Sequence, residues 1–108
     1  MRNRSDFEAG HKAGVNAVRP LSAFEMSHYA EDFKVGYVVA LAEIHSIRCA
    51  SPWAAGVEAA EMGQQYRIPY AVLEPHFDDP ANPEVLDALR RGYNVDDEDD
   101  DDYFDDSD

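Results

Sequence analysis

Residues 32–47 read DFKVGYVVALAEIHSI, and this stretch decides the predicted fold. Its apolar side chains recur every three or four positions, which places them on one face of a helix. The members of this face are Phe33, Tyr37, Ala40, Leu41, Ile44 and Ile47. The charged residues Glu31, Lys34 and Glu43 fall mostly off it. The stretch therefore predicts a long amphipathic helix, the longest of the chain.

Two capping signals precede this helix. Ser22 to Glu25 read Ser-Ala-Phe-Glu, a capping box in which the hydroxyl and the carboxylate each satisfy an unpaired helix amide. We expect this box to open the long helix, with Ser27 as an alternative start. The same pattern at Ser5 to Glu8 predicts an earlier helix from Phe7 to Val18, which ends before Arg19-Pro20.

A polar cap followed by proline marks two later helices, because proline is tolerated at the first helical position. Ser51-Pro52 opens a predicted helix that runs to about Tyr66. Asn82-Pro83 opens another, which extends from Glu84 to Tyr93. Between these two helices, residues 70–77 form a short apolar segment that we also interpret as a helix.

Glycines fall mostly inside the predicted helices. Each costs a helix about 1 kcal/mol relative to alanine, and the usual compensation is the close approach of a neighbouring helix or an aromatic ring. The six glycines are Gly10, Gly14, Gly36, Gly56, Gly63 and Gly92. Strand signals hardly appear. The sequence thus predicts an all-α fold, a compact bundle of four to five short helices over residues 1–95, packed closely at its glycines.

The last thirteen residues, 96–108, read DDEDDDDYFDDSD and hold ten of the chain's 23 acidic residues and no basic one. The formal net charge of the chain is −14, so this tail contributes −10 and the first 95 residues only −4. A segment of this charge density repels itself and cannot bury apolar area. We expect residues 96–108 to form a disordered acidic tail on a nearly ordinary helical body.

Composition disfavours several classes of protein. A single cysteine, Cys49, cannot form an internal disulfide or a four-cysteine zinc site. The start lacks the apolar run of a secretory signal. The longest apolar run, Val35 to Ala42, is far shorter than the roughly 18 residues of a membrane span. Net negative charge opposes direct binding to nucleic acid or an anionic membrane, because phosphates are repelled. We expect a cytoplasmic protein.

Catalytic and metal sites find little support in the sequence. No nucleophile elbow, phosphate loop or dinucleotide fingerprint is present. Cys49 and His45, one helical turn apart, could form a thiolate pair, but a lone cysteine near a helix end is usually a small buried hydrophobe. His76, Asp78 and Asp79 supply too few fixed ligands for a metal, and the tail lacks the spacing of a calcium loop. The sequence predicts no enzyme, no metal site and no cofactor.

A weaker acidic surface is expected on the body. Its acidic residues are Glu58, Glu61, Glu74, Asp78, Asp79, Glu84 and Asp87. If they share a face, they extend the negative field of the tail over the folded domain. The nearby basic residues Arg67, Arg90 and Arg91 either pair with these carboxylates or fold the tail back onto the body.

Four short motifs characterise the body. They are residues 7–14 (FEAGHKAG), 32–37 (DFKVGY), 51–56 (SPWAAG) and 91–93 (RGY). On these motifs, residues 7–93 resemble a small family of uncharacterised short helical proteins found in enterobacteria and their phages. The resemblance implies a compact helical domain and brings no known activity, and the tail lies outside it. In charge alone, the chain is also similar to phage-encoded inhibitors that imitate DNA.

The tail carries the first functional hypothesis, a non-enzymatic inhibitor or modulator that binds a basic, nucleic-acid-binding host protein. Seven consecutive acids can occupy the Lys/Arg groove that normally holds nucleic acid. Two aromatic residues among them can anchor in an apolar pocket or a base-stacking platform. The expected partner-binding residues are Asp96, Asp97, Glu98, Asp99, Asp100, Asp101, Asp102, Tyr103 and Phe104.

Two alternatives stay open. In one, the chain is a structural or adaptor domain that self-associates into a homo-oligomer, with Trp53 and Phe24 as exposed apolar anchors and a tail that only confers solubility. In the other, more remote, the chain is an enzyme that depends on Cys49. Partner binding that survives loss of the tail would favour the first alternative, and a silent Cys49→Ala substitution would exclude the second.

Overall fold

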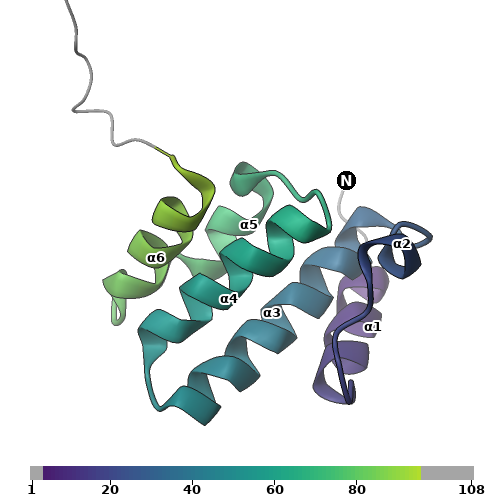
Figure 1. The fold of residues 1–108 in the computed structure, drawn as a ribbon, viewed down its shortest axis with the longest axis horizontal. Coiled ribbons are helices and arrows are strands. Elements are labelled where there is room, and N and C mark those ends of the chain that lie inside the picture. The colour runs from purple at the N-terminus through teal and green to yellow at the C-terminus, as the bar shows by residue number, and fades with distance from the viewer. Residues whose placement is uncertain (1–3, 96–108) are drawn as a thin grey trace, which may run out of the picture.

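The computed structural model of the chain describes residues 4–95, which form six helices and no strand (Figure 1). The helices are α1 (Arg4–Val15), α2 (Ala23–Met26), α3 (Glu31–Cys49), α4 (Pro52–Gln65), α5 (Tyr70–Phe77) and α6 (Pro83–Tyr93). The predicted all-α bundle is therefore confirmed, with one short helix more than the four or five expected. The predicted acidic tail, residues 96–108, lies outside the described residues.

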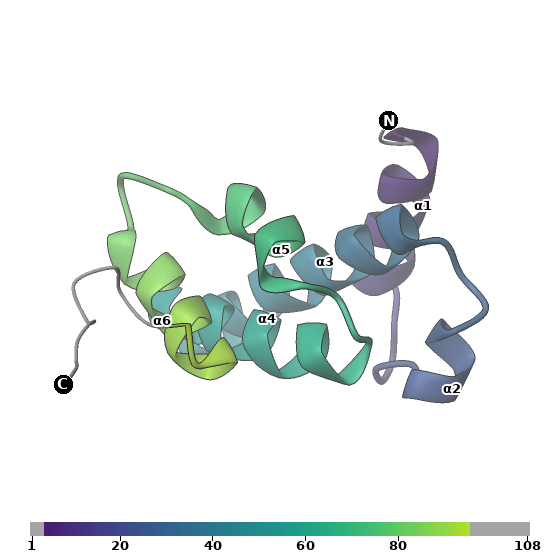
Figure 2. The same cartoon turned by 90° about the horizontal axis from the view of Figure 1, so that it is seen from above.

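The helices pack mainly as neighbours of α3 and α4. Helix α1 packs against α3, α3 against α4, and α4 against α6, so these four lie side by side in that order (Figure 1). Helix α5 lies over one side of this layer and contacts α3, α4 and α6 (Figure 2). The short α2 lies at the end of the molecule away from α6 (Figure 2). None of the helices in residues 4–95 is long and apolar enough to cross a membrane.

Helix α3 is central, and this corrects the predicted single apolar face. All six residues from Val35 to Ala40 are buried, because α1 covers one side of α3 while α4 and α5 cover others. A helix buried on most sides is apolar around its circumference instead of along one stripe. Ile47, predicted to face inward, is 78% exposed near the C-terminal end of α3.

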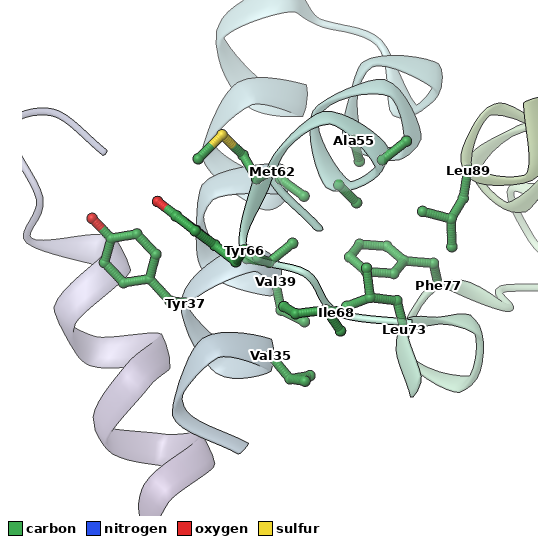
Figure 3. Close-up of a cluster of buried hydrophobic side chains, with 14 of the residues drawn as sticks. Val35, Tyr37, Val39, Ala55, Met62, Tyr66, Ile68, Leu73, Phe77 and Leu89 are labelled. Atoms are coloured by element: carbon green, nitrogen blue, oxygen red, sulfur yellow. The ribbon is translucent and has the colours of Figure 1, made fainter. Parts of the chain in front are cut away.

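The core lies where α3, α4, α5 and α6 meet. Figure 3 shows its side chains converging from these helices and from the α4–α5 connection. Leu73 of α5 and Leu89 of α6 are completely buried, as is most of the Ile68 side chain between α4 and α5. Burying such a side chain contributes about 1.5–3 kcal/mol. Val85 of α6 is also buried in this core, and Leu86 packs against it partly buried.

The segment before α3 departs from the prediction. The capping box at Ser22 forms as expected: Glu25 N donates to Ser22 Oγ at 3.1 Å and Ser22 N donates to Glu25 Oε1 at 2.9 Å. However, it opens only the four-residue α2, and α3 begins separately at Glu31 after the cap residue Ala30. The fully buried side chain of Met26 fixes α2 to the core, so the chain must turn before it can enter α3.

Helix α1 begins and ends earlier than predicted. Ser5 lies inside α1 and not at its cap, and the helix ends at Val15 instead of Val18. The side-chain amide of Asn16 donates to the carbonyl of Lys12 at 3.1 Å, a local bond of the kind that competes with helix continuation. The predicted limits of α4, α5 and α6 agree with the structure to within one residue.

The predicted close packing at glycines is confirmed. A β-carbon built on Gly10 of α1 would overlap the carbonyl oxygen of Phe33 in α3, and one built on Gly56 of α4 would overlap the carbonyl oxygen of Val85 in α6. The backbones therefore approach more closely than any larger residue would permit. The gain in helix–helix contact offsets the low helix propensity of glycine at these positions.

Candidate functional site

The predicted partner-binding residues, Asp96 to Phe104, lie outside the described residues, but the structure shows where they attach. Helix α6 ends at Tyr93, and Asn94 in a left-handed conformation (φ 58°) leads to Val95. Two hydrogen bonds hold this end: Gln64 Nε2 donates to Gly92 O and the Tyr93 hydroxyl donates to Ile68 O, both at 2.6 Å. The acidic segment therefore starts from a helix end that is fixed to the α4–α5 region.

Arginines near this end pair with acidic residues of the body. Arg91 Nε lies 3.2 Å from the Asp87 carboxylate, and the Arg91 guanidinium lies over the Trp53 ring at 5.7 Å. Arg90 lies 3.9 Å from the Glu74 carboxylate, and its Nε donates to the Tyr70 hydroxyl at 3.1 Å. Arg90 and Arg91 therefore pair with carboxylates of the body, which was one of the two predicted alternatives. These ion pairs neutralise part of the acidic surface expected on the body.

Glu58 of α4 occupies a different environment from the paired acids. Partial burial raises the pKa of its carboxyl group; nearby His45 opposes this shift and nearby Glu61 adds to it. The seven acidic residues considered on the body thus include exposed, paired and half-buried groups. These residues therefore do not form a uniform negative face.

Cys49 differs from its predicted burial. It is exposed at the C-terminal end of α3, and its Sγ lies 3.7 Å from Nε2 of His45. Cys49 is the last residue of α3, at the turn that leads into α4. His45 and Cys49 are four positions apart, as neighbours on a helix surface are. Neither residue lines any of the hollows described below.

The two apolar anchors predicted for an adaptor are both exposed. Phe24 of α2 is 74% exposed and contacts the His28 ring edge-to-face at 5.1 Å. Trp53 at the start of α4 is 38% exposed, with Val57 exposed one turn further along the helix. The two aromatics belong to separate hollows of the surface and do not form one patch.

One hollow of the described surface is a groove between α3 and α5, which we call the α3–α5 groove. It has a volume of about 460 Å³, and residues from the first turns of α4 and α6 also line it. Its lining consists of Val39, Glu43, Ser46, Ile47, Pro52, Ala55, His76, Phe77, Asp79, Asn82 and Val85. Figure 3 shows Val39, Ala55 and Phe77 directed toward the shared interior of these helices.

Hydrogen bonds and a ring contact fix the polar rim of this groove. Glu43 Oε1 lies 3.0 Å from Nε2 of His11, which joins α3 to α1. His76 stacks on the Phe7 ring at a centroid distance of 5.2 Å, which joins α5 to α1. The carboxylate of Asp79 accepts bonds from Ala81 N at 3.0 Å and from Asn82 Nδ2 at 3.2 Å.

The structure brings together residues that the sequence placed far apart. His76 and Asp79 were considered as a loop cluster, whereas Glu43 was noted only as a residue off the apolar face of the long helix. Their common groove depends on the packing of α3 against α5, for which no local pattern gives a signal. Within residues 4–95, no group of three or more His, Cys, Asp or Glu is placed to hold a metal ion.

These features define a small all-α domain with an acid-rimmed groove and an acidic segment attached to its last helix. A family model matches residues 1–95, and the chain belongs to this family, described as protein of unknown function (DUF2623). None of the curated proteins and none of the solved structures compared with the chain matches it. The predicted resemblance to an uncharacterised family is thus confirmed, while an enterobacterial or phage origin stays a prediction.

Proposed function

We propose that this protein is a non-enzymatic inhibitor or modulator that binds a basic, nucleic-acid-binding protein in the cytoplasm. The acidic segment, residues 96–108, would occupy the partner's nucleic-acid groove by imitating the charge of nucleic acid. The observation that carries the proposal is the segregation of charge, with −10 of the chain's −14 in this one segment. A phage-encoded inhibitor of the DNA-mimic type is the most specific form of this proposal.

Two features of the body support this function. At the end of α6, Gln64 donates a hydrogen bond to Gly92 O and the Tyr93 hydroxyl donates one to Ile68 O. The acidic segment therefore starts from a fixed position. Arg91 and Arg90 each contact an acidic group of the body, Asp87 and Glu74, so these ion pairs balance part of the positive charge near the end of α6. A partner with a Lys/Arg groove would gain the same counterion release that it gains from nucleic acid.

Charge-neutralised variants of the full chain provide the test. In one variant the seven acids at positions 96–102 are replaced by their amides, which preserves length and shape. Basic proteins captured from a host lysate by the unmodified chain are identified, purified and measured individually. We expect the amide variant to lose most of this binding, and raising salt from 50 to 200 mM to weaken binding of the unmodified chain by more than about tenfold. Duplex DNA should displace the chain.

A second variant separates charge from aromatic anchoring. It carries Tyr103→Ser and Phe104→Ser and keeps every carboxylate. We expect it to bind more weakly than the unmodified chain but more strongly than the amide variant. Undiminished binding by the amide variant, or a complex that duplex DNA cannot displace, would contradict the proposed function.

The exposure of Trp53 and Val57 favours a second candidate, an adaptor domain that self-associates through α4. This candidate predicts a concentration-dependent increase in molecular mass in sedimentation experiments. Trp53→Ser should abolish that increase, because aromatic anchors contribute most of the energy of such interfaces. The amide variant should behave as the unmodified chain does in the same experiment.

A further inference from the structure

We infer that the α3–α5 groove receives a segment of the partner in which an apolar side chain is flanked by lysine or arginine. The inference rests on the proposed function, and it gives the folded body a contact with the same basic protein. The groove would hold the apolar side chain on its floor, while its carboxylates would meet the flanking cations.

The floor and one edge of the groove are apolar. Val39, Phe77 and Val85 line its interior from three different helices. At the edge, Ile47 is 78% exposed near the C-terminal end of α3. The volume of about 460 Å³ lies within the 300–1,000 Å³ typical of pockets that bind ligands. The groove therefore has room for one large apolar side chain.

The charge of the rim selects a basic segment. Glu43, which also contacts His11, and Asp79 both line the groove together with His76, and none of its lining residues is lysine or arginine. Asp79 is held in place by the backbone amide of Ala81 and the side chain of Asn82, both of them neutral donors. Its negative charge is therefore oriented but not compensated by these contacts. A cationic side chain that enters here finds a carboxylate whose position is already fixed.

Other hollows on the described surface are less suited to a basic segment. The hollow beside Phe24 is lined by Lys34 and Arg67. The hollow beside Trp53 is lined by both Arg91 and Glu61, and the one along α1 by both Lys12 and Glu8. Each of these cations would repel lysine or arginine in a partner. Charge complementarity thus distinguishes the α3–α5 groove from these three hollows.

One partner can reach both the groove and the acidic segment. Val85, in the first turn of α6, lines the groove, and the acidic segment follows the other end of the same helix. Eleven residues of helix span roughly 16 Å, at 1.5 Å per residue. A basic protein that holds the segment would therefore place neighbouring residues within reach of the groove.

Chemical-shift mapping on the full ¹⁵N-labelled chain tests this inference. The probe is the peptide acetyl-Arg-Arg-Leu-Arg-Arg-amide, and the matched probe carries serine in place of leucine. We expect the leucine peptide to shift the backbone amides of Glu43, Ile47, His76 and Asp79. It should bind there at least about tenfold more tightly than the serine peptide, because only leucine gains from burial on the apolar floor.

Substitutions in the full chain provide the second arm. The double variant Glu43→Gln with Asp79→Asn should weaken groove binding by about fivefold, as expected for two partly exposed ion pairs. Glu31→Gln, at the other end of α3, removes one carboxylate outside the groove and should leave groove binding nearly unchanged. Ile47→Ser should weaken binding of the leucine peptide. The control is Val18→Ser, which should not weaken it, because Val18 is fully exposed and lines none of the hollows described.

The amide variant of residues 96–102 separates this inference from the proposed function. Groove shifts that persist in the amide variant support the groove as a site of its own. Shifts that disappear in this variant, or that are equal for the leucine and serine peptides, overturn the groove assignment and leave the proposed function standing. Conversely, retained capture of basic proteins by the amide variant contradicts the proposed function without affecting the peptide result.

Discussion

Gly10 of α1 and Gly36 of α3 make room for each other's helix at a single crossing. A β-carbon on Gly10 would overlap the carbonyl oxygen of Phe33, and one on Gly36 would overlap the carbonyl oxygen of Phe7. The two helices are thus in backbone contact from both sides. This crossing also sets the position of His11 relative to Glu43, and hence one rim of the α3–α5 groove.

The glycine crossing predicts that alanine will destabilise the fold where helix propensity alone predicts the opposite. Gly10→Ala gains about 1 kcal/mol in propensity, but the new methyl group meets backbone that cannot rotate away. We expect a net loss of about 2 kcal/mol in the free energy of unfolding for Gly10→Ala and for Gly36→Ala. The double variant should lose less than the sum, because one separation of the helices relieves both overlaps.

Urea denaturation followed by circular dichroism measures these losses. The matched control is Ala9→Gly, at an exposed neighbouring position of α1, which should cost about 1 kcal/mol from propensity alone. A gain in stability on Gly10→Ala would show that the two helices are not in backbone contact in solution.

At Ala50, in contrast, we expect a substitution to glycine to stabilise the fold. Ala50 follows α3 in a left-handed conformation with φ 53°, and its amide donates to Ile47 O at 3.2 Å. This conformation costs a residue with a β-carbon about 1 kcal/mol or more, whereas glycine adopts it freely. Ala50→Gly should therefore raise the midpoint of urea denaturation by an amount that corresponds to about 1 kcal/mol. Equal destabilisation by Ala50→Gly and Ala9→Gly would contradict the left-handed cap.

Local patterns predicted much of this fold because several helices carry their own start signals. Ser51-Pro52 and Asn82-Pro83 fix the starts of α4 and α6 within one residue. A fresh helix start at Ser27 was one alternative, but the actual start of α3 at Glu31 was not predicted, since it depends on the burial of Met26 in a core formed by distant residues. The groove was missed for the same reason: Glu43 and His11, which contact each other, are 32 positions apart.

Glu58 gives a prediction about pH. Burial is the main cause that raises the pKa of its carboxyl group above the ordinary value of 4.5. When a folded-state pKa lies above the unfolded one, stability is highest at low pH and is lost as pH rises from the unfolded value through the folded one. At pH 7 the charged form therefore weakens the fold, and Glu58→Gln should stabilise it by less than about 1 kcal/mol, because the site is partly solvated.

The gain from Glu58→Gln should disappear near pH 4, where the carboxyl group is largely protonated in both states. Unfolding free energies from urea titrations between pH 4 and pH 7 provide the measurement. Glu31→Gln, at an exposed position in the first turn of α3, is the matched control and should show no such gain. A constant difference across this pH range would mean that burial of Glu58 is not the source of the effect.

Tyr93 links the end of α6 to high-pH stability. Its hydroxyl donates to Ile68 O at 2.6 Å, and burial raises the pKa of the phenol from 10.0 to about 12. Because the folded pKa is the higher one, this contribution is complete below pH 10 and is lost as pH rises from 10 to 12. Tyr93→Phe should cost about 1 kcal/mol at pH 8, since it leaves the Ile68 carbonyl without its donor.

The same substitution should reduce the fall in stability between pH 10 and pH 12. Part of the fall should remain, because burial also raises the pKa of Tyr66, whose hydroxyl donates to Leu21 O at 2.6 Å. Urea midpoints measured at intervals from pH 8 to pH 12 test this, with phenolate absorbance recorded in parallel. Tyr29→Phe, a change on an exposed ring, is the control and should leave the slope as it is in the unmodified chain. If Tyr93→Phe leaves the slope equally unchanged, the bond to Ile68 does not hold the end of α6, and only the bond from Gln64 to Gly92 O is left to fix it.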